Sequence, residues 1–320
     1  MSVGAAAKPR HGAPTAGWTR TQRIKNAILY ALARGTISVL QRLPATTLRA
    51  AGRAVGRLAY VAFGPARRTA LANVARALHT LPPAARTAIV RRCYTRLGEH
   101  LGDTLALLGG APFAPLALDA AARTVLEEAL GEGMGVVFVS AHLGPWERVA
   151  GSLVAAGFPL TTVAREAYDP RLTRVYDALR SRLGVGVVYR GAPGAAARLL
   201  RALKRGQLLG MPMDLRSRVP SVDAPFLGHA AATAGGPARI ALRTGAPVVI
   251  GTGAAGPLVI TATRIPTSDL APTPEGEIEL TTRMNLELSS RILALPEEWV
   301  WMHARWRDES PSGEARSTRY

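Results

Sequence analysis

The sequence predicts an α/β protein with a mostly parallel central sheet flanked by helices and with basic amphipathic helices at the N-terminus. From residue 118 onward, short apolar segments alternate with helical segments, as in parallel sheets covered by helices. Apolar residues make up 48% of the 320-residue chain, which supports a sizeable core and excludes a disordered protein. The first third has helical periodicity and a strong basic bias.

The positive charge is concentrated near the N-terminus. Residues 1–100 contain 17 basic residues and one acidic residue, Glu99, so they carry +16 of the net charge of +18. Such a segment faces an anionic partner, either nucleic acid or a membrane surface. Aromatic residues are sparse there and no base-reading motif is present. We therefore expect a membrane partner and no nucleic acid, with a non-catalytic basic binding module as the alternative.

Two amphipathic helices are expected in this basic segment, at residues 24–43 and 48–63. Basic residues interrupt the first, which makes it a helix that lies on a membrane surface or a poor membrane-spanning helix. The second has arginines at four-residue intervals, which suit lipid phosphates: Arg49, Arg53 and Arg57. The alternative is a pair of ordinary core helices with arginines facing solvent.

The remaining elements follow in order. Two further helices are expected at 67–78 and 84–108, before a linker rich in glycine and proline. Residues 244–263 are uncharged and long enough to span a bilayer, but their glycines and prolines favour two buried strands. Helices are expected at 118–130, from about 145, and at 170–183, 195–204 and 234–244, with strands at 135–140, 159–164, 185–189, 208–213, 247–251 and 257–263.

These elements divide the chain into four parts. They are a mobile basic tail at 1–20, a helical membrane-associating region at 21–110, an α/β domain at 111–307 and a flexible tail at 308–320. Residues 1–20 lack the apolar core of a signal peptide. The single cysteine, Cys93, excludes an intramolecular disulfide and a cysteine-based zinc site. No metal is expected.

The strongest chemical signal lies directly after the predicted strand 135–140. His142 follows that strand, and Glu147 lies five residues later, in the first turn of the next helix. Functional residues collect at the carboxyl ends of strands in open α/β sheets. A carboxylate on one ring nitrogen would fix the tautomer and leave the other nitrogen free to accept a proton. We therefore expect Glu147 to orient His142 as a general base, with a structural histidine as the alternative.

The sequence of this turn, His142-Leu-Gly-Pro-Trp-Glu147, resembles the His-x4-Asp/Glu motif of glycerolipid acyltransferases. More narrowly, the chain resembles the bacterial lipid A late acyltransferases (the lauroyl/myristoyl transferases) from about residue 20 to residue 307. Further segments match that family in order: Arg67-Arg68-Thr-Ala-Leu-Ala-Asn73, Ala164-Arg165-Glu166, Arg180-Ser181-Arg182, Met213-Asp214-Leu215-Arg216, Pro225-Phe226-Leu-Gly228, Ala231-Ala232-Thr233, Gly245-Ala246-Pro-Val-Val249 and the closing Trp-Val-Trp-Met-His-Ala-Arg-Trp at 299–306. One departure is that many members have Asp-x-Asp where this chain has only Asp214.

The resemblance implies a membrane-associated enzyme that moves a fatty acyl group from a thioester to a lipid hydroxyl, without a cofactor. The donor would be acyl carrier protein or coenzyme A, and the acceptor a lipid A precursor or, alternatively, a lysophospholipid or phosphatidylinositol mannoside. His142 and Glu147 would be catalytic, and Arg180, Arg165, Asp214 and Arg216 would bind substrate. The expected location is the cytoplasmic face of the inner membrane, held peripherally or by one N-terminal anchor.

Overall fold

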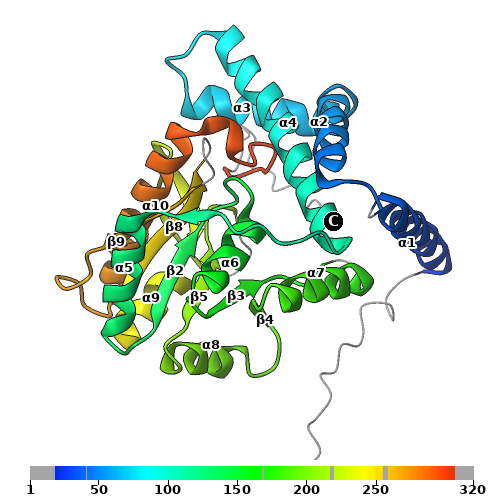
Figure 1. Cartoon of the computed structure of the whole chain (residues 1–320). Coiled ribbons are helices and arrows are strands. Elements are labelled where there is room, and N and C mark those ends of the chain that lie inside the picture. Colours follow the sequence, from blue (N-terminus) through cyan, green and yellow to red (C-terminus); the bar gives the residue numbers. More distant parts are fainter. Residues whose placement is uncertain (1–18, 41, 168, 217–219, 255–258, 307–320) are drawn as a thin grey trace, which may run out of the picture.

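The structure is a computed structural model that describes residues 19–40, 42–167, 169–216, 220–254 and 259–306. The chain begins with α1 (Arg20–Leu40), α2 (Ala45–Ala62), α3 (Gly64–Ala77) and α4 (Pro83–Leu108) (Figure 1). These helices confirm the helical prediction for the N-terminal third. Of the predicted tails, residues 1–18 and 308–320 lie outside the described residues.

The α/β fold predicted for the rest of the chain is confirmed. The strands are β1 (Ala117–Leu118), β2 (Val136–Ser140), β3 (Leu160–Ala164), β4 (Gly186–Tyr189), β5 (Leu208–Pro212), β6 (Ser221–Phe226), β7 (His229–Ala234), β8 (Val248–Ala254) and β9 (Val259–Ile265). The helices are α5 (Ala120–Gly131), α6 (Trp146–Ala155), α7 (Pro170–Arg182), α8 (Ala195–Lys204), α9 (Gly236–Thr244) and α10 (Pro274–Ala294), and a 3-10 turn spans Pro296–Glu298.

Seven of the strands form one sheet in the order β1-β9-β8-β2-β5-β3-β4. The five strands from β8 to β4 run parallel, whereas β9 runs antiparallel to β8 and parallel to β1. β2 is the central strand of the seven, between β8 and β5. The carboxyl ends of β2 and β5 therefore meet at the same edge of the sheet, which is where the candidate site lies.

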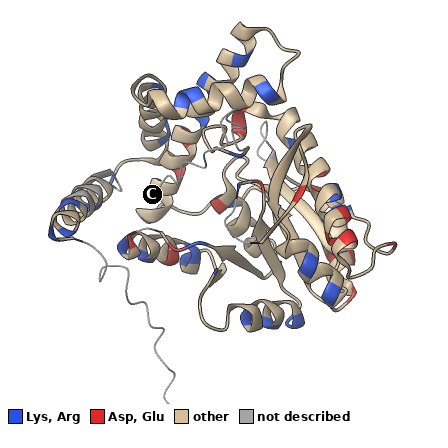
Figure 2. Cartoon of the chain, turned by 180° about the vertical axis from the view of Figure 1, so that it is seen from behind, with Lys and Arg blue, Asp and Glu red and all other residues tan. Residues whose placement is uncertain are grey.

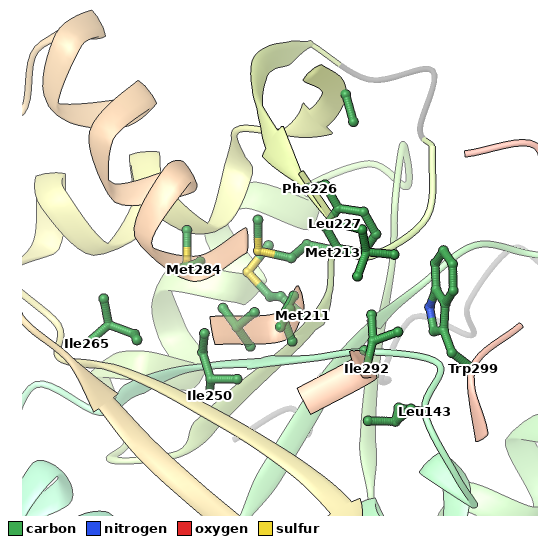
Figure 3. Close-up of a cluster of buried hydrophobic side chains, with 14 of the residues drawn as sticks. Leu143, Met211, Met213, Phe226, Leu227, Ile250, Ile265, Met284, Ile292 and Trp299 are labelled. Atoms are coloured by element: carbon green, nitrogen blue, oxygen red, sulfur yellow. The ribbon is translucent and has the colours of Figure 1, made fainter. Parts of the chain in front are cut away.

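Helices cover both faces of the sheet, because its central strands are apolar on both sides. Val137 and Val139 of β2 face one core, which α9 and α10 cover. The side chains from α10 are Leu280, Met284, Leu288 and Ile292. Val136 and Phe138 face the other core, beneath α5, α6 and α7. Figure 3 shows part of the first core, in which Met211 lies beside Ile250. The rings of Phe226 and Trp299 in this core are in contact, with centroids 5.6 Å apart.

Glycines let α2 approach α4 closely. A Cβ on Gly52 would lie 2.1 Å from the carbonyl oxygen of Gly98, and a Cβ on Gly98 would lie equally close to that of Gly52. The arginines of α2 also face α4, since Arg49 pairs with Asp103 and Arg53 pairs with Glu99. This differs from the expectation that both arginines face lipid phosphates, because α4 presents a carboxylate opposite each of them.

Three elements lie outside the sequence prediction. The segment 221–234 forms the antiparallel hairpin β6–β7, which turns at Leu227 and Gly228 with positive φ angles of 49° and 80°. The helix α10 buries Leu280, Met284, Leu288 and Ile292. The third is the short strand β1. In addition, α5 starts two residues later than expected, because the side chain of Asp119 caps it by accepting a hydrogen bond from the backbone N–H of Ala122. The turn between the last two strands was expected at residues 252–256, but β8 continues to Ala254, and residues 255–258 lie outside the described residues.

Candidate active site

His142 and Asp214 meet at the carboxyl ends of β2 and β5. The two strands are paired up to Ser140 and Pro212, so the residues that follow them emerge side by side. The Nδ1 atom of His142 lies 2.9 Å from Oδ1 of Asp214, and the backbone N–H of His142 donates to Oδ2 over 2.9 Å. Because the carboxylate accepts at Nδ1, the proton sits on that nitrogen and Nε2 is left to accept a proton from a substrate.

The C-terminal segment holds this pair in place. The indole N–H of Trp299 donates to Oδ2 of Asp214 over 2.8 Å, and both residues have no exposed surface. Leu143 forms a β-bridge with Trp299, and the N–H of Gly144 donates to the carbonyl oxygen of Glu298 over 3.0 Å. Gly144 has a φ of +67°, a left-handed conformation that glycine adopts without strain. The turn that carries His142 is thus fixed on both sides.

This environment favours the imidazolium form of His142. Burial lowers the pKa of His142, but the charge and hydrogen bond of Asp214, together with the charge of Glu147, outweigh burial and raise it above 6.5. Burial likewise raises the pKa of Asp214, but the His142 charge and the hydrogen bonds from His142 and Trp299 outweigh it, so the net pKa is lowered. Asp214 stays ionised and stabilises the positive charge that the ring gains as it accepts a proton.

Glu147 has a different partner from the one expected. Its carboxylate forms a two-pronged ion pair with Arg180 of α7, with Oε1 2.6 Å from Nη2 and Oε2 3.1 Å from Nε. The orienting carboxylate on His142 is Asp214 instead, because Glu147 lies in the first turn of α6 and faces α7. The expectation that Asp214 contacts substrate also differs from the structure, since its side chain is fully buried against His142 and Trp299.

The pair opens into a large cavity of about 610 Å³. Its inner part follows the face of the sheet beneath α6, where Phe138, Leu160, Gly210 and Gly251 line it. A Cβ on Gly251 would lie 2.3 Å from the ring of Phe138, so glycine at this position makes room for the ring. The shape and lining fit an extended apolar chain.

Arginines surround the outer part of this cavity. Arg165 follows β3 and Arg216 follows Asp214; both are exposed, and both line the cavity. Arg190, which the sequence analysis did not single out, also lines it. Burial and the charge of Arg165 lower the pKa of Arg190. Arginines that line one cavity in this way favour an anionic ligand.

His303 has a structural role beside the site. Its Nε2 accepts a hydrogen bond from the backbone N–H of Arg216 over 3.1 Å, so this nitrogen carries no proton. Burial is the main cause that lowers the pKa of His303 and keeps its ring neutral. His303 therefore fixes the start of the loop after β5.

Two functional contacts were missed by sequence reasoning. Trp299 was noted only within the closing Trp-rich motif, although its indole N–H bonds Asp214. Trp146, inside the His142–Glu147 turn, stands edge-on to the imidazole with ring centroids 5.2 Å apart. The available signal for Trp299 was its indole N–H, a donor that usually finds a hydrogen-bond partner when buried, in a short motif rich in His and Trp. For Trp146, its place inside the motif was the signal.

The fold and this site are those of an α/β enzyme with a histidine–carboxylate pair at the sheet edge and an apolar cavity beside it. The family model for the bacterial lipid A biosynthesis acyltransferase matches residues 19–308. The chain therefore belongs to this family and is an acyltransferase at the level of the family. A search of curated proteins gives no significant match.

Proposed function

We propose that this protein transfers a fatty acyl group from a thioester of acyl carrier protein or coenzyme A to a hydroxyl of a lipid A precursor or a related glycolipid. The observation that carries the proposal is the His142–Asp214 pair at the mouth of the 610 Å³ cavity. A histidine held by a buried carboxylate can act as a general base, and the apolar cavity beside it accommodates an acyl chain.

The chemistry follows from these positions. As the acceptor oxygen attacks the thioester carbonyl, its proton passes to Nε2 of His142, and Asp214 stabilises the imidazolium. The tetrahedral intermediate then expels the thiolate, which takes the proton back from His142. Arg180 bonds Glu147 through Nε and Nη2, so we assign its remaining nitrogen, Nη1, to the developing oxyanion or a substrate phosphate. Arg165 and Arg216 are the further phosphate ligands in this proposal.

The protein binds the cytoplasmic face of the inner membrane in this proposal. Leu58 and Val61 of α2 are each 67% exposed, and Ile24 and Ile28 of α1 are each 54% exposed. Lys and Arg residues lie on the same helices (Figure 2), as they do in helices that lie in the lipid headgroup region. Within the part of the chain that the structure describes, no helix is long and apolar enough to cross a bilayer. We therefore favour peripheral attachment.

Mass spectrometry of reactions with purified protein tests the proposal. Lauroyl-coenzyme A and lauroyl-acyl carrier protein are offered with a lipid A precursor, a lysophospholipid or a phosphatidylinositol mannoside. We expect one lauroyl increment on the lipid A precursor with the wild-type protein and none with His142→Ala. No transfer to any acceptor from either donor would refute the function, and transfer to a different lipid alone would change the acceptor class.

A further inference from the structure

A second cavity, of about 300 Å³, lies between α4, α7 and the turn that carries His142. It shares five residues with the larger cavity: His142, Trp146, Glu147, Arg165 and Arg180. The two cavities therefore meet at the imidazole and reach it from different sides. A transfer reaction needs two substrates at one base, and the structure offers one cavity for each of them.

The lining of the smaller cavity differs from that of the larger one. α4 contributes His100, Asp103 and Thr104. The carboxylate of Asp103 is buried between Arg49 and Arg148, and the Nδ1 atom of His100 is buried without a hydrogen-bond partner. Thr104 and Arg165 also line this cavity, and an alkyl chain placed here would cover their polar groups without bonding them. A group that carries several hydroxyls can bond them instead.

The position of the smaller cavity also fits a substrate that arrives from a membrane. Leu101 of α4 and Tyr176 of α7 line it and are 50% and 43% exposed. α1 lies against the same helix α7, because Arg171 bonds the carbonyl oxygen of Asn26 and stacks 4.4 Å from the ring of Tyr30. The helix α1, which carries the exposed Ile24 and Ile28, thus lies against one of the two helices that line this cavity.

From these observations we propose that the cavity between α4 and α7 binds the hydroxyl-bearing head group of the acceptor lipid, while the larger cavity holds the acyl chain of the thioester. The inference rests on the acyl-transfer function proposed above. The acceptor hydroxyl reaches His142 from the α4–α7 side, and Thr104 is the group on α4 best placed to bond a neighbouring hydroxyl. The side-chain oxygen of Thr104 donates to the carbonyl oxygen of His100 over 2.9 Å, so its lone pairs stay available to a ligand.

Steady-state kinetics with separate KM values for the two substrates test this assignment. In Thr104→Val the shape is kept and the hydroxyl is lost, so the KM of the lipid A precursor should rise about 3- to 10-fold relative to the KM of lauroyl-coenzyme A. Tyr176→Ala should likewise raise the KM of the lipid A precursor relative to the KM of lauroyl-coenzyme A. Tyr176→Phe keeps the ring and should keep the wild-type ratio of the two KM values. Thr95→Val is the matched control, because Thr95 lies on the same helix, makes the same bond to the carbonyl oxygen of Arg91 over 3.0 Å, and lies outside the cavity.

The outcomes separate this inference from the proposed function. If Thr104→Val and Tyr176→Ala raise the thioester KM and leave the acceptor KM at the wild-type value, the assignment of the cavities is reversed and the proposal is wrong. If neither KM changes relative to Thr95→Val, the cavity takes no part in binding, and the proposal is also wrong. A wild-type protein that transfers no acyl group contradicts the proposed function itself.

Discussion

The imidazole of His142 and the carboxylate of Asp214 face each other across two adjacent parallel strands, with Nδ1 2.9 Å from Oδ1. Seventy-two residues separate them in the chain, and the pairing of β2 with β5 brings them together. Trp299 donates to the same carboxylate from a third segment. The base is thus held by contacts between segments far apart in the sequence, and not by the motif in which it lies.

Asp214→Asn should therefore abolish most of the transfer activity while the fold survives. The amide keeps the shape but removes the charge that stabilises the imidazolium, and it favours the wrong tautomer of His142. The comparable change in a serine protease triad lowers kcat about 10⁴-fold. His142→Ala should cost about 10²–10⁴ in rate. Turnover is measured beside circular dichroism of the same samples, and folded variants with near wild-type turnover would show that the base lies elsewhere.

The pH dependence of the reaction should reflect the protonation of His142 and the effect of Asp214 on its pKa. His142 acts as a base only when neutral, and its pKa lies above 6.5 because the negative charges of Asp214 and Glu147 outweigh the effect of burial. We therefore expect kcat/KM to rise with pH through a value above 6.5. In Asp214→Asn the residual activity should rise at a lower pH than in the wild-type protein, because the charge that raises the pKa of His142 is removed. A profile of kcat/KM from about pH 5 to 9 checks this. If kcat/KM rises at the same pH in Asp214→Asn as in the wild-type protein, the charge of Asp214 does not control the pKa of His142.

The sequence predicted the sheet and most of its helices because each is a local pattern: a short β-branched run or a helical apolar face. It also placed His142 and Asp214 at strand ends.

The partner of His142 was predicted wrongly, because spacing along the chain favoured Glu147. Which carboxylate lies next to His142 depends instead on the order of the strands in the sheet. The hairpin at Leu227 was missed since its first turn residue is not one that favours positive φ. The helix α10 was missed although Leu280, Met284, Leu288 and Ile292 recur every four residues.

Substitutions in the ion pair of Glu147 and Arg180 distinguish a catalytic role of Arg180 from a structural one. If Arg180 binds an oxyanion or a phosphate, Arg180→Ala should lower turnover about 10²–10³-fold. Loss of the partner should make Glu147→Gln poorly active as well, and the double variant should be no worse than the weaker single variant. Turnover and melting temperature are measured for each protein.

Arg283→Ala is the control for this experiment, because Arg283 of α10 also pairs with a carboxylate, that of Asp269, but lies away from both cavities. This variant should lose stability only. If Arg180→Ala also lowers the melting temperature but keeps turnover within a few-fold of wild type, the guanidinium is structural and its assignment to substrate is wrong.

The exposed apolar face of α2 gives a direct test of membrane binding. Leu48, Gly52 and Gly56 are buried in the protein, so removal of the whole helix would damage the fold. Leu58→Glu with Val61→Glu changes only side chains that are each 67% exposed. Burial of such side chains in lipid contributes about 1.5–3 kcal/mol each, so sedimentation with anionic vesicles should weaken at least about tenfold.

The same charge change on α10, Leu286→Glu with Leu293→Glu, is the control, because those side chains are 57% and 43% exposed on a different helix. This control should sediment with vesicles like the wild type. Equal sedimentation of all three proteins would mean that α2 does not contact the membrane.

Gly210 lies at the inner part of the large cavity and should set the length of acyl chain that fits. A Cβ at this position would lie 3.5 Å from Leu160 and Thr162, an ordinary contact, so Gly210→Ala fits the fold and fills only cavity space. The added methyl group shortens the space available to the chain. Each methylene that loses its buried position costs about 0.8 kcal/mol, so the ratio of kcat/KM for myristoyl- over lauroyl-coenzyme A should fall about 4- to 10-fold.

Competition between the two thioesters, followed by mass spectrometry of the product, measures this ratio directly. Gly131→Ala is the matched control, because a Cβ there meets nothing within 4 Å and Gly131 lies outside the cavity, at the end of α5. That variant should keep the wild-type ratio. Because both substrates compete in one tube, a general loss of activity leaves the ratio unchanged, and an unchanged ratio in Gly210→Ala would mean that the acyl chain binds elsewhere.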